Sequence, residues 1–185
     1  MEATAQEVDA AVRAVHEVRG SLADRTVLAA FLRSAADRLE AARDSLVETA
    51  DAETALGPVR LTGELARTCH QLRALAGIVD EGAFLDVVID HPDDTAVPPV
   101  PDLRRYKVPL GVVAVYSASN FPFAFSAPAA TPPAPSRPCP VVVKAHPDHP
   151  ALSEYAARCC AAPPPGTASP TASSAWCTAS RPASS

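Results

Sequence analysis

The sequence has 185 residues, a formal net charge of −5 and a pI of about 5.5, so it lacks the basic footprint of a nucleic-acid-binding protein. No apolar run reaches the ~18 residues that a membrane span requires, and the first residues lack the basic and apolar segments of a secretory signal. We therefore expect a cytoplasmic protein without nucleic-acid or membrane partners, long enough for one domain and part of another.

The cysteines predict free thiols rather than disulfides or a metal site. An odd number of cysteines without a secretory signal argues against a disulfide framework. No pair has the C-x-x-C spacing of a zinc site, and no spaced histidine pair accompanies them. The cysteines are Cys69, Cys139, Cys159, Cys160 and Cys177.

The first part of the chain predicts amphipathic helices. A first helix is indicated by the spacing of Val8, Val12 and Val15. Asp24 is a suitable N-cap for a second helix, which we expect to continue until Gly57 and Pro58 break it. Its expected apolar face consists of Leu28, Phe31, Leu32, Ala35, Leu39, Ala42 and Leu46.

A third helix is predicted from about Arg60 to Gly82, where the glycine ends it. The residues expected to point inward from this helix are Leu61, Leu65, Leu72, Leu75 and Ile78.

Strand-like segments follow the helices. Residues 84–90 are rich in β-formers, and residues 103–108 alternate weakly, as in an edge or bridging strand. Residues 111–116 and 141–143 are continuously apolar and β-branched, as in strands buried on both faces of a parallel sheet. Two such strands with a helix-length connection predict a βαβ unit.

Two segments depart from this globular pattern. Residues 127–138 contain prolines too densely for the crossover helix of a βαβ unit. Residues 156–185 contain no Leu, Ile, Val, Met, Phe or acidic residue, so this low-complexity tail is predicted to be disordered.

The strand 109–116, with Ser-Ala-Ser-Asn-Phe-Pro at 117–122, resembles the cofactor-binding domain of NAD(P)-dependent aldehyde dehydrogenases, as does Lys-Ala-His-Pro at 144–147. Segments at 53–73 and 101–111 are similar to the N-terminal part of that family. The residues of these motifs most resemble those of NADP-preferring 2,5-dioxovalerate (α-ketoglutaric semialdehyde) dehydrogenases. The resemblance implies an N-terminal fragment of an α/β fold, in which helices precede the beginning of a Rossmann-like parallel sheet.

This likeness implies a division of the chain. Residues 1–108 would form a helical and bridging-strand region, and residues 109–155 the start of the NAD(P)-binding domain. In the full-length parent it implies oxidation of a small-molecule aldehyde by a homo-oligomer.

Asn120 matches the family's side-chain oxyanion donor. Taken alone, the same asparagine fits a turn that caps the strand before Phe121 and Pro122. The resemblance favours the oxyanion role for Asn120, and a place beside the substrate and nicotinamide for Phe121 and Pro122. The latter pair fits a packing role equally well.

Lys144 matches the lysine that hydrogen-bonds the adenosine ribose, at the strand edge where dinucleotides bind. NAD-specific relatives often have a glutamate where this sequence has Pro147, so a 2′-phosphate is not repelled and NADP is expected, with NAD also allowed. His146 is a further candidate contact, although a lone histidine is more often a turn residue. No metal is expected, and none of the cysteines matches the family's nucleophile, so the chain alone is expected to be inactive.

The proline-rich segment and the tail suggest a shifted reading frame. Read one base earlier, with G or C at free codon positions, residues 129–138 can encode Gly-Gly-Asp-Thr-Ala-Cys-Ala-Leu-Ala-Ala, a helical segment. The same shift turns residues 166–185 into a strand-like segment. We hypothesise small insertions or deletions, with the frame restored before Cys139 and lost after about Arg158. The alternatives are a non-enzymatic remnant that binds a partner and a product without function.

Overall fold

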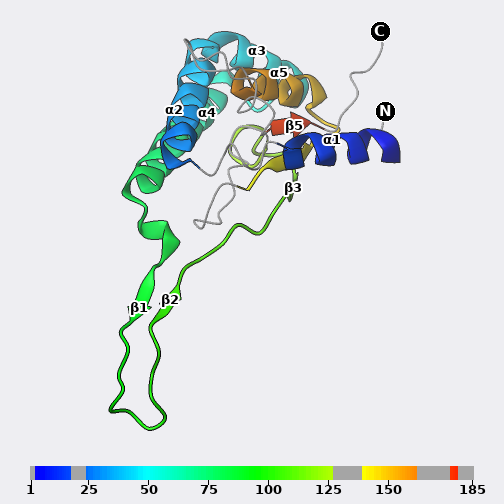
Figure 1. Cartoon of the computed structure of the whole chain (residues 1–185). Coiled ribbons are helices and arrows are strands. Elements are labelled where there is room, and N and C mark those ends of the chain that lie inside the picture. Colours follow the sequence, from blue (N-terminus) through cyan, green and yellow to red (C-terminus); the bar gives the residue numbers. More distant parts are fainter. Residues whose placement is uncertain (1–2, 18–23, 127–138, 162–175, 179–185) are drawn as a thin grey trace.

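The computed structural model describes residues 3–17, 24–126, 139–161 and 176–178. Helices dominate its first half, and a small parallel sheet follows (Figure 1). The helices are α1 (Ala5–Glu17), α2 (Arg25–Ala41), α3 (Arg43–Thr54), α4 (Pro58–Glu81) and α5 (Pro150–Ala161), with a short 3-10 helix η2 (Ala83–Leu85). The strands are β1 (Val88–Asp90), β2 (Leu103–Arg105), β3 (Val113–Tyr116), β4 (Val141–Lys144) and β5 (Trp176–Thr178).

The start of α2 follows the sequence prediction. The Asp24 carboxylate accepts the backbone N–H groups of Thr26 at 2.8 Å and Val27 at 3.4 Å, so it satisfies two donors that the first helical turn leaves unpaired. The expected single helix is wrong, however, because the chain leaves helical geometry at Ala42 (φ −94°, ψ 12°) and starts α3 at Arg43.

The long helix α4 begins at Pro58, two residues before the expected start at about Arg60, and ends at Gly82 as predicted. Pro58 occupies its first turn, where its missing N–H costs nothing. Gly82 ends it in the left-handed region (φ 76°) and donates its N–H to the Ile78 carbonyl at 3.0 Å. The expected inward orientation of Ile78 is wrong: it is 42 % exposed, and Ala76 and Val79 are buried in its place. Leu75 is half-buried.

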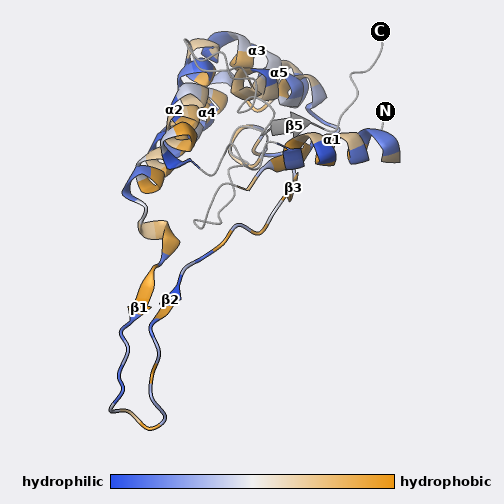
Figure 2. Cartoon of the chain, in the orientation of Figure 1, coloured by the Kyte–Doolittle hydropathy of each residue, from blue (hydrophilic) through white to orange (hydrophobic). Residues whose placement is uncertain are grey.

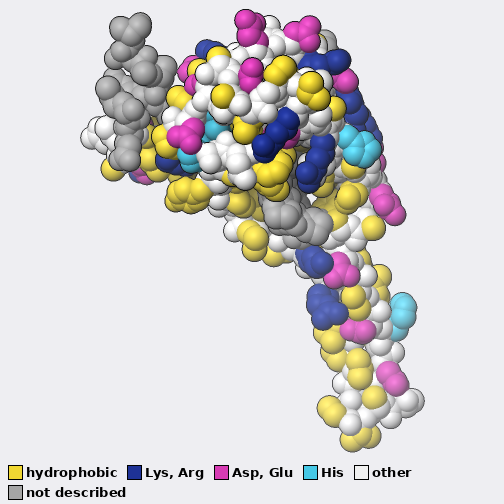
Figure 3. Space-filling model, turned by 180° about the vertical axis from the view of Figure 1, so that it is seen from behind, with side chains coloured by type: hydrophobic (Ala, Val, Ile, Leu, Met, Phe, Trp, Pro, Cys, Tyr) yellow, Lys and Arg dark blue, Asp and Glu magenta, His cyan; other side chains and the backbone are white. Residues whose placement is uncertain are grey.

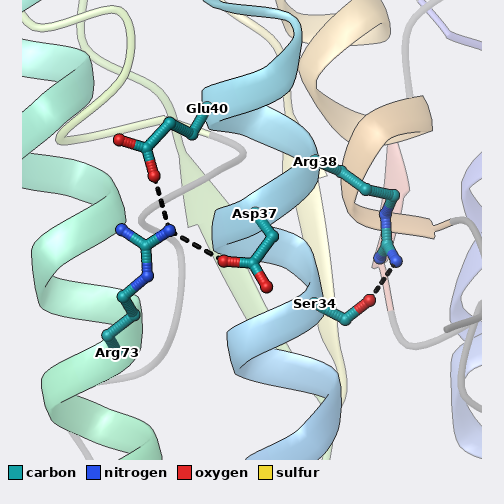
Figure 4. Close-up of polar contacts among 5 residues, drawn as sticks. All are labelled: Ser34, Asp37, Arg38, Glu40 and Arg73. Carbon is teal, nitrogen blue, oxygen red and sulfur yellow. Dashed lines mark hydrogen bonds and ion pairs between the residues drawn. The ribbon is translucent and has the colours of Figure 1, made fainter.

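Helices α2 and α4 lie side by side and form the largest helix contact (Figure 1). Their contact is apolar at its centre, where Phe31, Leu39, Leu65 and Leu72 are fully buried. At its rim, the Arg73 guanidinium lies between the carboxylates of Asp37 at 2.7 Å and Glu40 at 2.6 Å (Figure 4). These exposed ion pairs raise the pKa of Arg73 through hydrogen bonds, but exposed pairs contribute at most about 1 kcal/mol, so packing dominates the contact.

Arg38 points away from α4 and holds the end of α5 (Figure 4). Its guanidinium donates to the carbonyl oxygens of Cys159 at 2.5 Å and Cys160 at 3.1 Å. A cation at these unpaired carbonyls stabilises a helix C-terminus. The predicted disorder from residue 156 onward is therefore wrong up to Ala161, because Ala156 and Cys160 are buried against the core.

The three-stranded sheet has the order β3-β4-β5 and is parallel throughout, as predicted for the first two strands. Strand β4 is buried on both faces: Val141 and Val143 face the main core, while Val142 packs against Ala11 and Val15 of α1. Strand β3 is not buried on both faces as expected, because Val113 and Val115 are half-buried, whereas Ala114 and Tyr116 are exposed, Tyr116 to 78 %. The expected crossover segment, 127–138, and the tail segments 162–175 and 179–185 lie outside the described residues. Residues 176–178 form β5, which corrects the predicted disorder there.

The first predicted helix forms as α1, but only Val15 of its three valines is fully buried; Val8 and Val12 are exposed. Strand structure in 84–90 is shorter than expected, because Phe84 and Leu85 lie in η2 and β1 starts at Val88.

Strands β1 and β2 pair antiparallel and form an arm that projects from the helical body (Figure 1). Apolar residues occur along this arm, as the colouring in Figures 2 and 3 shows. Ile89, Val97 and Leu103 are exposed there. The strand predicted over residues 103–108 is therefore present only at Leu103–Arg105, as β2. Among the described residues, no helix has both the length and the apolar character for a bilayer crossing.

Candidate functional site

The candidate site lies where the parallel strands β3 and β4 end. Tyr116 and Lys144 are register partners at these ends, and the Ser117 N–H donates to the Lys144 carbonyl at 3.2 Å. The carboxyl ends of adjacent parallel strands are where α/β folds bind ligands. The segments that leave the two strands, 117–126 and 145–149, carry all the site residues predicted from sequence beyond Lys144 itself.

The segment after β3 folds into a closed turn around Asn120. The Ala118 N–H donates to the Phe125 carbonyl, and the Phe125 N–H donates to the Phe121 carbonyl, both at 3.1 Å. The Phe121 and Phe125 rings meet edge to face with centroids 5.1 Å apart. Phe123 is fully buried and fixes the turn to the core, while Asn120 itself is exposed. The Asn120 side-chain amide is therefore exposed to solvent on a turn that backbone hydrogen bonds and the buried Phe123 hold in place.

Phe121 is half-buried and Pro122 is buried. Both therefore contribute packing to the turn, and Phe121 keeps part of its ring surface accessible.

Two side chains of α4 bind this turn. The Arg60 guanidinium donates to the Asn120 carbonyl at 2.6 Å and lies 5.3 Å from the centroid of the Phe121 ring. One helical turn later, Glu64 Oε1 accepts the backbone N–H groups of Phe123 at 2.7 Å and Ala124 at 2.8 Å. Sequence analysis missed both residues. The available signal was Glu64 at an inward position, three residues after Leu61, where a lone carboxylate requires partners.

The segment after β4 leads from Lys144 into α5. Lys144 and Pro147 are exposed, and His146 is half-buried. His146 Nδ1 accepts the Asp148 N–H at 3.2 Å and lies 3.5 Å from that residue's carboxylate. His146 is thus a turn residue in this geometry, which is the common role of a lone histidine. Its ring stacks on that of His149, with the two ring centroids 5.6 Å apart.

Sequence analysis also missed His149, which is fully buried and joins the two segments. Its Nε2 lies 2.9 Å from the Ala118 carbonyl and its Nδ1 lies 3.1 Å from Ser153 Oγ. A carbonyl can only accept, so Nε2 carries the proton.

Glu53 of α3 holds the first turn of α5 by accepting the N–H groups of Ala151 at 3.0 Å and Leu152 at 2.8 Å.

The described cysteines lack the exposure of a nucleophilic thiol, and Cys69, Cys159 and Cys160 also lack its low pKa. Cys69, Cys139 and Cys160 are buried and Cys159 is half-buried. Burial raises the pKa of Cys160 strongly, and it also raises the pKa values of Cys69 and Cys159. A raised pKa lowers the thiolate fraction near neutral pH, and the thiolate is the nucleophilic form.

The described residues hold no cluster of three or more His, Cys, Asp or Glu side chains suited to a metal ion. A groove of about 610 Å³ lies between α3 and α4, lined by Asp44, Val47, Glu48, Asp51, Ala52, Pro58 and Thr62. It contains none of the predicted site residues, so the strand ends remain the candidate site.

Comparison with a family model identifies the family of this chain. The family model described as "Aldehyde dehydrogenase family" matches residues 1–169. The chain belongs to the aldehyde dehydrogenase family.

Two curated members of the family are similar in sequence. Alpha-ketoglutaric semialdehyde dehydrogenase 2 of Azospirillum brasilense is 50 % identical over 133 residues, 70 % of this chain and 25 % of the relative. Alpha-ketoglutaric semialdehyde dehydrogenase of Acinetobacter baylyi is 41 % identical over 165 residues, 85 % of this chain and 31 % of the relative. The chain therefore spans between a quarter and a third of the length of these relatives.

Solved structures of other aldehyde dehydrogenases share the fold. An NAD-dependent benzaldehyde dehydrogenase from Corynebacterium glutamicum superimposes with a TM-score of 0.77 at 22 % identity, over 96 % of this chain and 36 % of that one. An NADP-dependent glyceraldehyde-3-phosphate dehydrogenase from Bacillus halodurans, complexed with NADP, gives 0.77 at 21 % identity, again over 96 % and 36 %. The expected truncated α/β fold of this family is therefore confirmed.

Proposed function

We propose that this chain is the N-terminal part of an NADP-dependent dehydrogenase that oxidises a semialdehyde to the carboxylate. The observation that carries the proposal is the meeting of the Asn120 turn and the Lys144 strand end at one edge of the sheet. Both curated relatives are named as α-ketoglutaric semialdehyde dehydrogenases, which supports a semialdehyde substrate. The division into residues 1–108 and 109–155, a homo-oligomeric parent and a cytoplasmic location belong to the same proposal.

In this proposal Asn120 donates its side-chain N–H to the aldehyde oxygen. Negative charge develops on that oxygen when a thiolate adds to the carbonyl carbon, and a fixed donor stabilises the charge without reorganisation. The exposed amide on an anchored turn suits this role. The thiolate and the general base would come from the portion of the relatives that this chain does not span.

In this proposal the segment after β4 binds the adenosine part of NADP. Lys144 is an exposed cation at the carboxyl end of a parallel strand, and the exposed Pro147 places no carboxylate three residues later. Lys144 would hydrogen-bond the ribose hydroxyls, and His146 and Pro147 would border the 2′-phosphate. Phe121 and Pro122 would shape the pocket beside the nicotinamide. Bound NADP⁺ supplies the hydride acceptor, and the Bacillus halodurans structure with NADP supports this cofactor, with NAD as the alternative.

A hybrid enzyme tests the proposal. Residues 3–126 and 139–161 of this chain replace the corresponding segments of the Acinetobacter baylyi relative, which aligns over 165 residues. That relative's own sequence supplies the rest. We expect the hybrid to form NADPH from α-ketoglutaric semialdehyde, and Asn120→Ala to lower kcat by about 10²–10³-fold. Gln6→Ala, which removes an exposed side-chain amide on α1, is the matched control and should leave kcat unchanged. Full kcat in the Asn120→Ala hybrid would overturn the assigned role.

We further propose that residues 127–138 and the tail after about Arg158 are read in a shifted frame. Their composition, with dense proline and no large aliphatic residue in 156–185, supports this proposal. Sequencing the coding DNA across codons 120–190 and several hundred bases beyond tests it. If the DNA restores a single reading frame that continues to codons for a nucleophilic Cys and a general-base Glu, the proposed dehydrogenase is supported. If the DNA encodes the sequence as it stands, including its last residue, the non-enzymatic remnant is favoured.

A further inference from the structure

Glu64 is a buried carboxylate that contacts the backbone of the Asn120 turn. Its side chain projects from α4 among apolar residues, and the residue is only 7 % exposed. One oxygen, Oε1, accepts both the Phe123 and the Ala124 N–H groups, at 2.7 and 2.8 Å. The other oxygen, Oε2, is buried and has no hydrogen-bond partner among the described residues. All hydrogen bonds found for this carboxylate therefore go to the turn.

A carboxylate in this position is costly unless its bonds are strong. Hydrogen bonds are stronger in the low-dielectric interior than in water, so the two N–H groups offset part of the cost of burying this side chain. Two bonds to consecutive peptide groups fix both the position and the rotation of that backbone segment. Glu64 thus determines where residues 123 and 124 lie relative to α4.

Arg60 binds the same turn from its outer side. Its guanidinium donates to the Asn120 carbonyl at 2.6 Å and covers the Phe121 ring at 5.3 Å. Arg60 and Glu64 are four residues apart, so they lie on one face of α4. The peptide of Asn120 is therefore held at its own carbonyl and again three and four residues later.

We propose that Glu64, assisted by Arg60, is a positioning residue that sets the orientation of the Asn120 side chain. The inference rests on the proposed function of Asn120 as the oxyanion donor. A donor must lie about 2.7–3.1 Å from the developing charge, and a misplacement of about 1 Å can cost about 10²-fold in rate. The two contacts remove the freedom of the turn to make such a displacement.

The first test uses the full 185-residue chain and requires no activity. Amide hydrogen exchange at residues 121 and 123–125, and the NMR signal of the Asn120 side-chain NH₂, are compared among wild type, Glu64→Gln and Glu64→Leu. Glu81→Gln, at an exposed position of the same helix, is the control. We expect exchange in the turn to rise at least about 10-fold in Glu64→Leu and less in Glu64→Gln, which keeps one acceptor oxygen. Unchanged exchange and an unchanged Asn120 signal would overturn the inference.

The second test is a double-mutant cycle in the hybrid enzyme. We expect Glu64→Gln to lower kcat by about 10-fold with little change in the KM for NADP⁺. In an Asn120→Ala background the same change should have no further effect, because Glu64 would act only through Asn120. Additive losses would show a general structural role and overturn the inference.

The two tests separate the inference from the function on which it rests. A hybrid that folds but does not oxidise the aldehyde contradicts the proposed function, and the exchange measurement then decides whether Glu64 orders the turn. An active hybrid with additive losses contradicts the inference alone. Glu64→Gln, which is close to isosteric, guards against a Glu64→Leu chain that does not fold.

Discussion

The imidazole of His149 donates from Nε2 to the carbonyl oxygen of Ala118 across 2.9 Å, which joins the start of α5 to the turn after β3. The ring is fully buried, and its Nδ1 lies 3.1 Å from Ser153 Oγ. The two segments that carry the candidate site residues are thus linked by one side chain. This link is separate from the α4 contacts of Glu64, which reach the far end of the same turn.

We expect His149→Ala to lower the free energy of unfolding by about 1–3 kcal/mol, because it removes a fully buried side chain and leaves the partly buried Ala118 carbonyl without its donor. Urea denaturation followed by circular dichroism measures the change. His70→Ala, at an exposed position of α4, is the control and should change stability by less than about 0.5 kcal/mol. Equal effects of the two substitutions would contradict the structural role of His149.

The sequence predicted the features that depend on local chemistry. Asp24 caps α2 and the left-handed Gly82 ends α4, both as predicted. Pro58 separates two helices as predicted, although α4 starts at Pro58 itself rather than at about Arg60. The parallel pairing of β3 with β4 followed from two apolar β-branched runs. These signals act over a few residues and can be read without knowledge of the tertiary structure.

The sequence did not predict features that depend on distant contacts. Tyr116 and Ala114 are exposed because they share one face of β3, an edge strand of the described sheet, and the continuous apolar run did not reveal this. The contacts of Glu64 and His149 join positions 59 and 31 residues away along the chain, so their partners are set by packing alone. Disorder was also wrongly predicted for residues 156–161 from their lack of large aliphatic residues. Small alanine and cysteine side chains are enough to pack the end of α5 against the core.

The contact between α2 and α4 should dominate the stability of the helical region. Leu65 is 1 % exposed in the main core, so we expect Leu65→Ala to lower the free energy of unfolding by about 2–5 kcal/mol through lost burial and the cavity it leaves. Val59→Ala on the same helix, at a residue that is 89 % exposed, should change it by less than about 0.5 kcal/mol. Urea denaturation of the two variants measures both effects, and a small loss for Leu65→Ala would contradict the packing described here.

The described cysteines should resist alkylation in the folded chain. Burial raises the pKa of Cys160, and the same cause raises the pKa of Cys69 and Cys159, so little thiolate is present at pH 7. Raising the pH toward 9 increases the thiolate fraction of an ordinary thiol but should accelerate these three much less. Peptide mapping after iodoacetamide treatment measures each rate, and we expect rates at least about 10-fold higher in urea. Fast native labelling of Cys160 at pH 7 would contradict its buried, protonated state.

Lys144 and Lys107 offer a matched pair, because they are the two lysines of the sequence. Lys144 is exposed at the end of β4, whereas Lys107 lies beyond β2 on the arm and pairs with Asp86 at 3.3 Å. We expect Lys144→Ala in the hybrid enzyme to raise the KM for NADP⁺ by about 10–100-fold with little change in kcat, since hydrogen bonds from a charged donor contribute about 1.5–3 kcal/mol. Lys107→Ala removes the same charge away from the strand ends, so it should leave this KM unchanged. Equal effects of the two substitutions would mean that net charge, and not a contact at the end of β4, attracts the nucleotide.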